Sequence, residues 1–177
     1  KSYAERLFDF PAIGPLDAAA ARQALTKPAA DQRVAFEPPA VEAILGRTQG
    51  YPYFLQEWGK HAWDAATGSP ITEADVDAAS ITALAALDES FFRVRFDRLT
   101  PAEKNYLRAM ADLGPGPHRS GEIAERLGRK VTQLAPVRNN LIAKGMIWSP
   151  SHGDTAFTVP LFDEFMRRIM PGGDWRA

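Results

Sequence analysis

Few reactive side chains stand at spacings that could form a catalytic or metal site. The three histidines, His61, His118 and His152, are far apart, and none has a second metal ligand at helical spacing. The run Ser151-His152-Gly153-Asp154 combines a hydroxyl, an imidazole and a carboxylate, but adjacent residues seldom point toward one reacting atom. Its composition is typical of a turn. We therefore predict a turn here, and neither a catalytic residue nor a metal site in this chain.

The motifs that hold nucleotides are also missing. The sequence has no G-x-x-x-x-G-K-[ST] loop, no G-x-G-x-x-G turn and no H-E-x-x-H pair. It contains no cysteine, which excludes disulfides and thiolate chemistry. We expect that this chain alone neither holds a nucleotide tightly nor hydrolyses one.

Length and charge limit the class of protein. The 177 residues are enough for one ample domain or two small ones, and 21 Lys+Arg against 22 Asp+Glu give a net charge of -1. This balance argues against a nucleic-acid binder held by bulk electrostatics. The longest stretch without a charged residue is Ala78–Leu87, far below the roughly 20 apolar residues of a membrane span. We expect a soluble, cytoplasmic protein with no membrane partner.

The charge is distributed unevenly along the chain. Residues 1–99 hold 10 Lys+Arg and 14 Asp+Glu, a net charge of -4, whereas residues 100–177 hold 11 and 8, a net charge of +3. A basic surplus in the second half mildly favours nucleic acid as a partner of that half.

The first half has the periodicity of four helices. We predict them at about residues 17–27, 38–49, 51–66 and 73–84. Asp17 is a suitable N-cap, and Pro28 is expected to end the first helix. Thr72 with Asp75 resembles a capping box for the fourth helix.

The second half reads as helices followed by a hairpin. Residues 87–99 are rich in charged and aromatic side chains, and we predict a helix that joins two units. Thr100-Pro101-Ala102-Glu103 is typical of a helix start. The predicted elements are helices at about 100–113, 120–127 and 132–144, strands at 146–148 and 155–159, and a last helix that contains Phe162 to Ile169.

The order of these elements resembles a winged helix-turn-helix domain. The pattern runs from Ser120-Gly121-Glu122-Ile123-Ala124-Glu125-Arg126-Leu127-Gly128 through Leu134, Val137 and Leu141 to Lys144-Gly145-Met146-Ile147. The expected fold is therefore mainly α: a four-helix lid bundle, then a winged helix-turn-helix domain with a small β-hairpin wing.

The winged-helix resemblance implies a DNA-facing helix at residues 132–144. If Leu134, Val137 and Leu141 point inward, polar residues face outward, and Asn and Gln can read adenine edges. The implied DNA-binding residues are Arg129, Lys130, Thr132, Gln133, Asn139 and Asn140. The same residues could form an ordinary solvated face, and Pro136 removes one helical hydrogen bond. The wing, residues 146–159, holds no Lys or Arg, which counts against tight DNA binding.

The whole chain resembles the region after the nucleotide-binding core of bacterial AAA+ or STAND-type ATPases, similar to origin-recognition and helicase-loader ATPases. The resemblance is carried by Ser2-Tyr3-Ala4-Glu5-Arg6-Leu7-Phe8, Ile13-Gly14-Pro15-Leu16-Asp17 and Gly50-Tyr51-Pro52-Tyr53-Phe54-Leu55-Gln56. It implies an N-terminal ATPase core that binds ATP or ADP with Mg²⁺ in a longer parent protein. The chain starts at Lys1, so we expect it to be a piece of that parent.

Gly50-x-Pro52 resembles the STAND Gly-x-Pro motif, in which the proline end of a lid helix approaches the bound nucleotide. The nucleotide-proximal residues that the resemblance implies are Gly50, Tyr51, Pro52, Arg47 and Arg6. Helicase-loader relatives place a sensor arginine on this helix, whereas this sequence has Tyr51, Tyr53 and Phe54, which puts arginine sensing in doubt. The alternative is that Gly50 and Pro52 only separate two packed helices.

The predicted organisation has five parts. They are an incoming segment from the ATPase core (1–15), a helical lid (16–86), a connecting helix (87–99), a winged helix-turn-helix domain (100–171) and a flexible tail (172–177). The predicted function is non-catalytic: to couple the nucleotide state of the core to a DNA or protein partner. The alternatives are a DNA-binding winged-helix regulator and a protein-interaction or autoinhibitory module, which Trp148 and Phe157 exposed on the wing would support.

Overall fold

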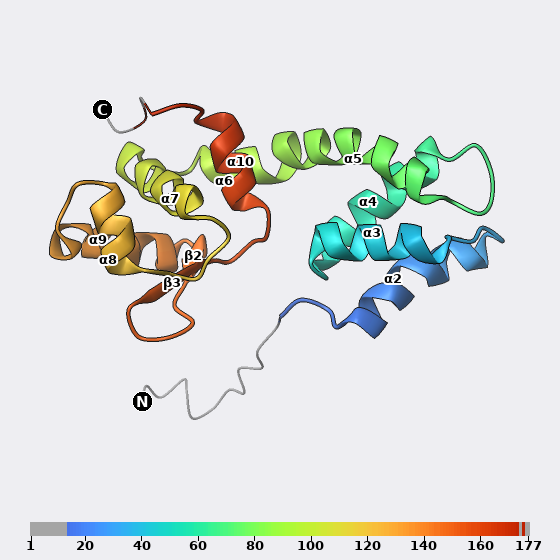
Figure 1. The fold of residues 1–177 in the computed structure, drawn as a ribbon, viewed down its shortest axis with the longest axis horizontal. Coiled ribbons are helices and arrows are strands. Elements are labelled where there is room, and N and C mark those ends of the chain that lie inside the picture. The colour runs from blue at the N-terminus through green and yellow to red at the C-terminus, as the bar shows by residue number, and fades with distance from the viewer. Residues whose placement is uncertain (1–13, 174, 176–177) are drawn as a thin grey trace. The chain divides into compact units, whose positions relative to one another are not determined.

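The computed structural model describes residues 14–173 and 175. Arg6 and nearly all of the incoming segment 1–15 lie outside these residues. The fold is mainly helical with a small three-stranded antiparallel sheet (Figure 1). The chain divides into two compact units, residues 1–80 and 81–177. No helix in the described part has both the length and the apolarity to cross a bilayer.

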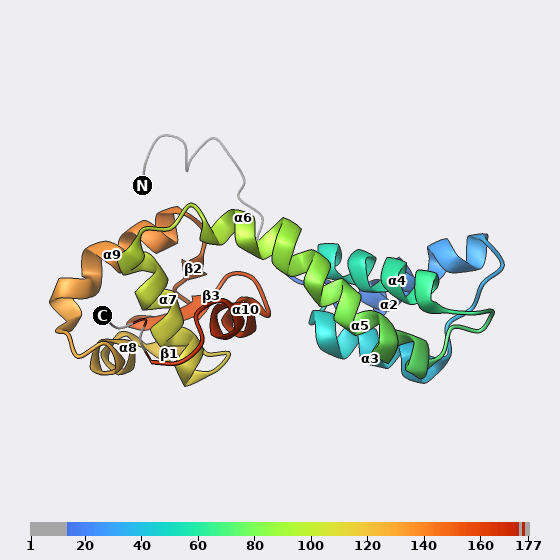
Figure 2. The same cartoon turned by 90° about the horizontal axis from the view of Figure 1, so that it is seen from above.

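The first unit is built from packed helices. They are α2 (Ala18–Asp31), α3 (Pro38–Thr48), α4 (Pro52–Ala65) and the first half of α5 (Glu73–Leu87). Helices α2, α3 and α4 all contact one another, and Figure 2 shows them side by side. Their shared core consists of fully or nearly fully buried apolar side chains: Ala21, Leu25, Ile44, Phe54, Leu55, Trp58 and Val76.

Two helices of this unit, α2 and α5, begin at the capping residues that the sequence predicted. The Asp17 carboxylate accepts a hydrogen bond of 2.8 Å from the Ala20 amide at the start of α2. At the start of α5 the Thr72 amide donates to Asp75 Oδ2 at 2.9 Å, and the Asp75 amide donates back to Thr72 Oγ1 at 3.2 Å. The Thr72 amide and the Thr72 hydroxyl, the latter at 2.7 Å, both donate to the Asp75 carboxylate and stabilise its charged form, so the pKa of Asp75 lies below its ordinary value.

The prediction that Pro28 ends the first helix is wrong. Helix α2 continues through Pro28 to Asp31. Proline has no amide hydrogen to donate, so α2 lacks one helical hydrogen bond at this position. The neighbouring side chains Leu25 and Ala29 are buried and hold this turn against the core.

The segment predicted as a connecting helix is helical, and its aromatic side chains enter the second core. Helix α5 runs to Leu87 and passes into a π-helical turn, η1 (Asp88–Phe92), and then α6 (Arg93–Phe96). Phe92 is fully buried, with its ring centroid 5.3 Å from that of Phe165 and 5.7 Å from that of Phe162. The segment therefore belongs to the hydrophobic core of the second unit.

The second unit carries the sheet. Its further elements are α7 (Pro101–Leu113), β1 (His118–Arg119), α8 (Ser120–Arg126), α9 (Val131–Ala143), β2 (Ile147–Trp148), β3 (Asp154–Phe157) and α10 (Phe162–Ile169). The strand order is β1-β3-β2, with His118 opposite Thr155 and Ile147 opposite Phe157. The two hairpin strands were predicted, but β1 was not. The capping box at Thr100 is present as predicted.

Charged side chains form part of this second interior. Glu103 is buried, and its carboxylate accepts a hydrogen bond of 2.7 Å from Lys144 Nζ. Asp112 pairs with the buried Arg108 and, at 2.8 Å, with Arg126. Arg108 also donates to the Met170 carbonyl at 2.8 Å. These bonds tie α7 to the helices around it.

Candidate functional site

Gly50 is one of the residues predicted to lie near the nucleotide, and its position in the fold by itself requires glycine. It adopts φ +71°, and a Cβ added there would lie 2.4 Å from the Leu16 carbonyl oxygen. The Leu16 amide donates to the Gly50 carbonyl at 2.9 Å. The space that a missing side chain leaves at Gly50 is thus filled by the backbone leading into α2. Packing alone requires glycine here, and a nucleotide role stays a prediction.

Tyr51 and Pro52 form the N-terminal end of α4. Tyr51 is the N-cap, and its ring lies 4.6 Å from that of Phe54, centroid to centroid. Pro52 is exposed and occupies the first helical position, where it has no N–H to offer. A helix N-terminus binds phosphate through such N–H groups. This end of α4 therefore has one amide donor fewer than a helix that starts with another residue.

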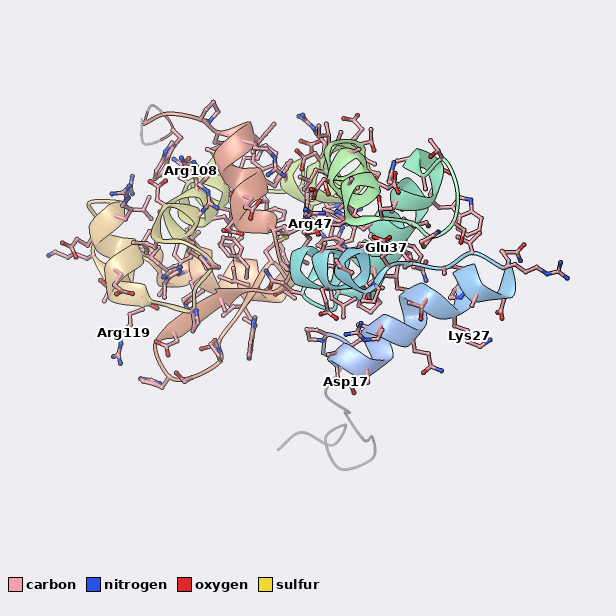
Figure 3. The ribbon with its side chains drawn as sticks, turned by 45° about the vertical axis from the view of Figure 1, so that its right-hand side comes forward. Asp17, Lys27, Glu37, Arg47, Arg108 and Arg119 are labelled. Atoms are coloured by element: carbon pink, nitrogen blue, oxygen red, sulfur yellow. The ribbon has the colours of Figure 1, made fainter. Side chains whose placement is uncertain are left out.

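Arg47 is held by a partner within the first unit. It lies in the last turn of α3 and is labelled in Figure 3. Its Nη2 forms an ion pair with Asp77 of α5. Its Nη1 is buried and makes no hydrogen bond within the described part of the chain. In this structure the charge of the Arg47 guanidinium is therefore already paired with Asp77.

Helix α9 presents the polar face that the sequence predicts. The side chains Arg129, Lys130, Thr132, Gln133, Asn139 and Asn140 are all exposed. Leu134 and Leu141 are buried on the opposite face, and Val137 is half-buried. Gln133 also has a local task, because its Oε1 accepts a hydrogen bond of 3.0 Å from the Lys130 amide at the helix start.

The positive charge around α9 divides into paired and unpaired residues. Arg126 and Lys144 pair with Asp112 and Glu103. Arg119, Arg129 and Lys130 are exposed, and none of them forms an ion pair with any residue that the structure describes; the Arg119 side chain points away from the ribbon in Figure 3. Unpaired cations of this kind can contact phosphates.

Sequence reasoning missed Arg138, which joins α9 to the hairpin. Its Nε donates to Thr155 Oγ1 at 3.0 Å, and its Nη2 donates to Ser149 Oγ at 3.0 Å and to the Asp154 carbonyl at 2.9 Å. Thr155 is fully buried and also hydrogen-bonds with Tyr106, whose pKa is raised by burial. The only sequence signal for Arg138 was its position beside Val137, at the edge of the inward face.

The hairpin carries one large exposed aromatic side chain. Trp148 is 51% exposed, whereas Phe157 is half-buried and lies 6.1 Å from Phe162, centroid to centroid. The residues Ser151, His152 and Gly153 form the predicted turn between β2 and β3, and His152 is exposed. Residues 14–173 and 175 contain no group of three or more His, Asp and Glu side chains that could hold a metal ion.

This chain shows limited similarity to known proteins. A family described as "Domain of unknown function (DUF8462)" matches residues 89–166, from η1 to α10. No curated protein matches. The solved structures to which the chain shows some similarity include the Thermotoga maritima RuvB Holliday junction branch migration motor, an AAA+ ATPase, with 17% identity and a TM-score of 0.40. A point variant of the same protein gives 18% identity and the same TM-score.

The extent of this likeness is partial. The alignment covers 81% of this chain and 47% of the RuvB chain, so the chain spans about half the length of the RuvB structures that it matches. At this identity and TM-score the likeness is loose.

Proposed function

We propose that this chain is a non-catalytic region of an AAA+/STAND-type ATP-binding protein that couples the nucleotide state of an ATPase core to a partner. In this proposal the first unit is the helical lid and the second is a winged helix. The order α7, α8, α9 and β2–β3 supports the second assignment, because a winged helix follows its recognition helix with a hairpin. ATP or ADP with Mg²⁺ would bind to the core of the parent protein.

The partner that the second unit supports best is double-stranded DNA. The observation that carries this choice is the exposed polar face of α9, with Thr132, Asn139 and Asn140 directed away from the core. Amide side chains on such a helix can hydrogen-bond to base edges in the major groove. Arg129 and Lys130 precede the helix and would contact phosphates.

Fluorescence anisotropy with short labelled duplexes tests this choice. We expect binding at low salt that weakens as salt rises, because phosphate contacts release counterions. Changing Arg129 and Lys130 together to Ala should lower the slope of log K against log salt by about 2, one per phosphate contact. Arg93→Ala is the matched control, since Arg93 is also exposed on the second unit but lies on α6. No anisotropy change with any duplex at low salt would reject DNA as the partner.

The same preparation tests the non-catalytic assignment. The purified chain should release no phosphate from ATP, because it lacks the phosphate loop that holds the nucleotide. ATP hydrolysis by the pure chain that persists however the preparation is changed would contradict the proposal.

A second candidate is protein docking through the hairpin, which the 51% exposure of Trp148 favours. Tryptophan is enriched among the residues that dominate the binding energy of protein interfaces. In this case duplexes would not bind, and Trp148→Ser would weaken association with the ATPase core of the parent protein.

A further inference from the structure

The hydrogen bonds of Arg138 leave one side of its guanidinium unused. A guanidinium has five N–H groups. The bonds to Thr155, Ser149 and the Asp154 carbonyl use the N–H of Nε and both N–H groups of Nη2. The two N–H groups of Nη1 make no hydrogen bond to any residue that the structure describes, and Nη1 is not among the buried side-chain atoms that lack a partner, so it is not fully buried. These two donors are therefore at least partly accessible to solvent.

The charge of Arg138 also lacks a counter-ion. All three of its acceptors are neutral oxygens, and within residues 14–173 and 175 it forms no ion pair. In contrast, Arg108, Arg126 and Arg167 of the same unit each pair with a carboxylate. A half-buried cation without a counter-ion has lost part of its hydration and attracts an anion more strongly than an exposed one does.

Arg138 is one of the residues that line a small pocket. The pocket has a volume of about 150 Å³. Its lining comprises the polar residues Tyr106, Ser120, Arg138 and Asn139 and the apolar residues Val131, Leu134 and Ala135. No carboxylate lines it. Sites for drug-sized molecules usually have about 300–1,000 Å³, so this volume suits one small oxyanion and excludes a nucleoside.

We propose that this pocket binds a phosphate group through Arg138 Nη1. The Asn139 side-chain amide lies on the same wall and can donate a further hydrogen bond. Arg119 and Lys130 directly precede the lining residues Ser120 and Val131, and both are exposed and positively charged. The phosphate group comes either from free inorganic phosphate or from a nucleic-acid backbone, and only the second source rests on the proposed function.

Titration of the intact chain with inorganic phosphate, followed by amide and guanidinium NMR, tests the pocket. At constant ionic strength with chloride as the balancing anion, we expect saturable shifts at Ser120, Val131 and Asn139 and at the Arg138 Nε–H. Chloride alone should not reproduce them. Absence of a saturable shift at these positions would overturn the proposal.

A variant that blocks the pocket without removing Arg138 sharpens the test. Ala135→Glu places a carboxylate on the pocket wall and keeps all three bonds from Arg138 to the hairpin. We expect it to weaken phosphate binding about tenfold or more, because a like charge beside the ligand repels it. Ala143→Glu is the control, since Ala143 is exposed near the other end of α9 and the variant adds the same charge. Equal loss in both variants would show a diffuse charge effect and overturn the proposal.

Competition between duplex and phosphate identifies the source. If an unlabelled duplex displaces phosphate from the pocket, the site receives a backbone phosphate of DNA. If phosphate stays bound while the duplex shifts only Arg129 and Lys130, the site serves free phosphate. If no duplex binds, DNA fails as the proposed partner, and the phosphate titration still decides the pocket.

Discussion

The interiors of the two units differ in the kinds of side chain that they bury. Among the described residues of the first unit, Thr48 is the single polar side chain in the buried core. The second unit buries Glu103, Arg108, Thr155 and Asp163 beside its aromatic cluster. Apolar packing depends on close approach and volume, whereas buried ions depend on specific partners. The first unit should therefore be sensitive to added atoms, and the second to lost charges.

Glycine packing illustrates the first mode. A Cβ at Gly59 of α4 would meet Leu25 Cδ1 of α2 at 2.9 Å, and one at Gly50 would meet the Leu16 carbonyl oxygen. The helices can approach this closely because these positions carry no side chain. The ion pairs of Asp112 and Glu103 illustrate the second mode, since each joins α7 to a different helix.

The largest expected effect comes from removing a buried charge in the second unit. Asp112→Ala leaves Arg108, whose side chain is only 7% exposed, without its carboxylate. We expect the free energy of unfolding of this unit to fall by about 3–5 kcal/mol. Urea denaturation followed by circular dichroism measures it. The control is Asp31→Ala, which breaks the exposed Lys27–Asp31 pair and should cost less than about 1 kcal/mol. Equal losses would remove the distinction between the units.

The next largest loss of stability should come from adding a single methyl group in the first unit. Gly50→Ala forces a side chain into a left-handed conformation and into the Leu16 backbone, and we expect a loss of about 2–4 kcal/mol. Gly46→Ala is the matched control, because its added Cβ meets nothing within 4 Å on helix α3. That change should stabilise the helix by about 0.5–1 kcal/mol. A neutral Gly50→Ala variant would contradict the close packing.

Acid should affect the second unit more than the first. Burial alone would raise the pKa of Glu103 and Asp112, but hydrogen bonds and charge from Lys144, and from Arg108 and Arg126, outweigh it and hold both pKa values below the ordinary 4.5 and 3.8. A lowered pKa in the folded state stabilises the fold above the unfolded pKa, and this stabilisation disappears as the pH falls through the folded one.

Methyl NMR can follow the two cores separately during acidification. As the pH falls below about 4.5, the Met110 methyl signal in the second unit should lose its folded position before that of Ile44 in the first. Asp75 also has a lowered pKa, but its bonds are at the start of α5 and outside both cores. Loss of both methyl signals at the same pH would show that buried charge does not distinguish the units.

Local sequence signals predicted much of the fold. The capping pairs at Thr72 and Thr100 predicted two helix starts, because the bonds involved span three residues. The change to a period of two after Gly145 predicted the hairpin strands. The extension of α2 beyond Pro28 and the strand β1 were missed, since a helix end and a two-residue strand depend on neighbours distant in sequence.

The sequence likewise predicted only part of the candidate site. Helical spacing was enough to place Leu134 and Leu141 inward and Asn139 and Asn140 outward, and the structure has them so. Spacing could not assign Arg138, because Thr155, Ser149 and Asp154 reach it only after the hairpin folds back. Spacing could not predict the role of Gly50 either, because glycine is needed there only through the close contact with Leu16.

The amino-acid sequence by itself determined where most helices lie, the capping residues Asp17, Thr72 and Thr100 and the polar face of α9, because each depends on bonds or periodicity within a few turns. Only the tertiary structure decided which charges are compensated. Arg126 and Lys144 have carboxylate partners, while Arg138 has neutral ones, and no spacing rule distinguishes them. A charge is paired or unpaired according to the atoms within a few ångströms of it, and folding alone selects those atoms.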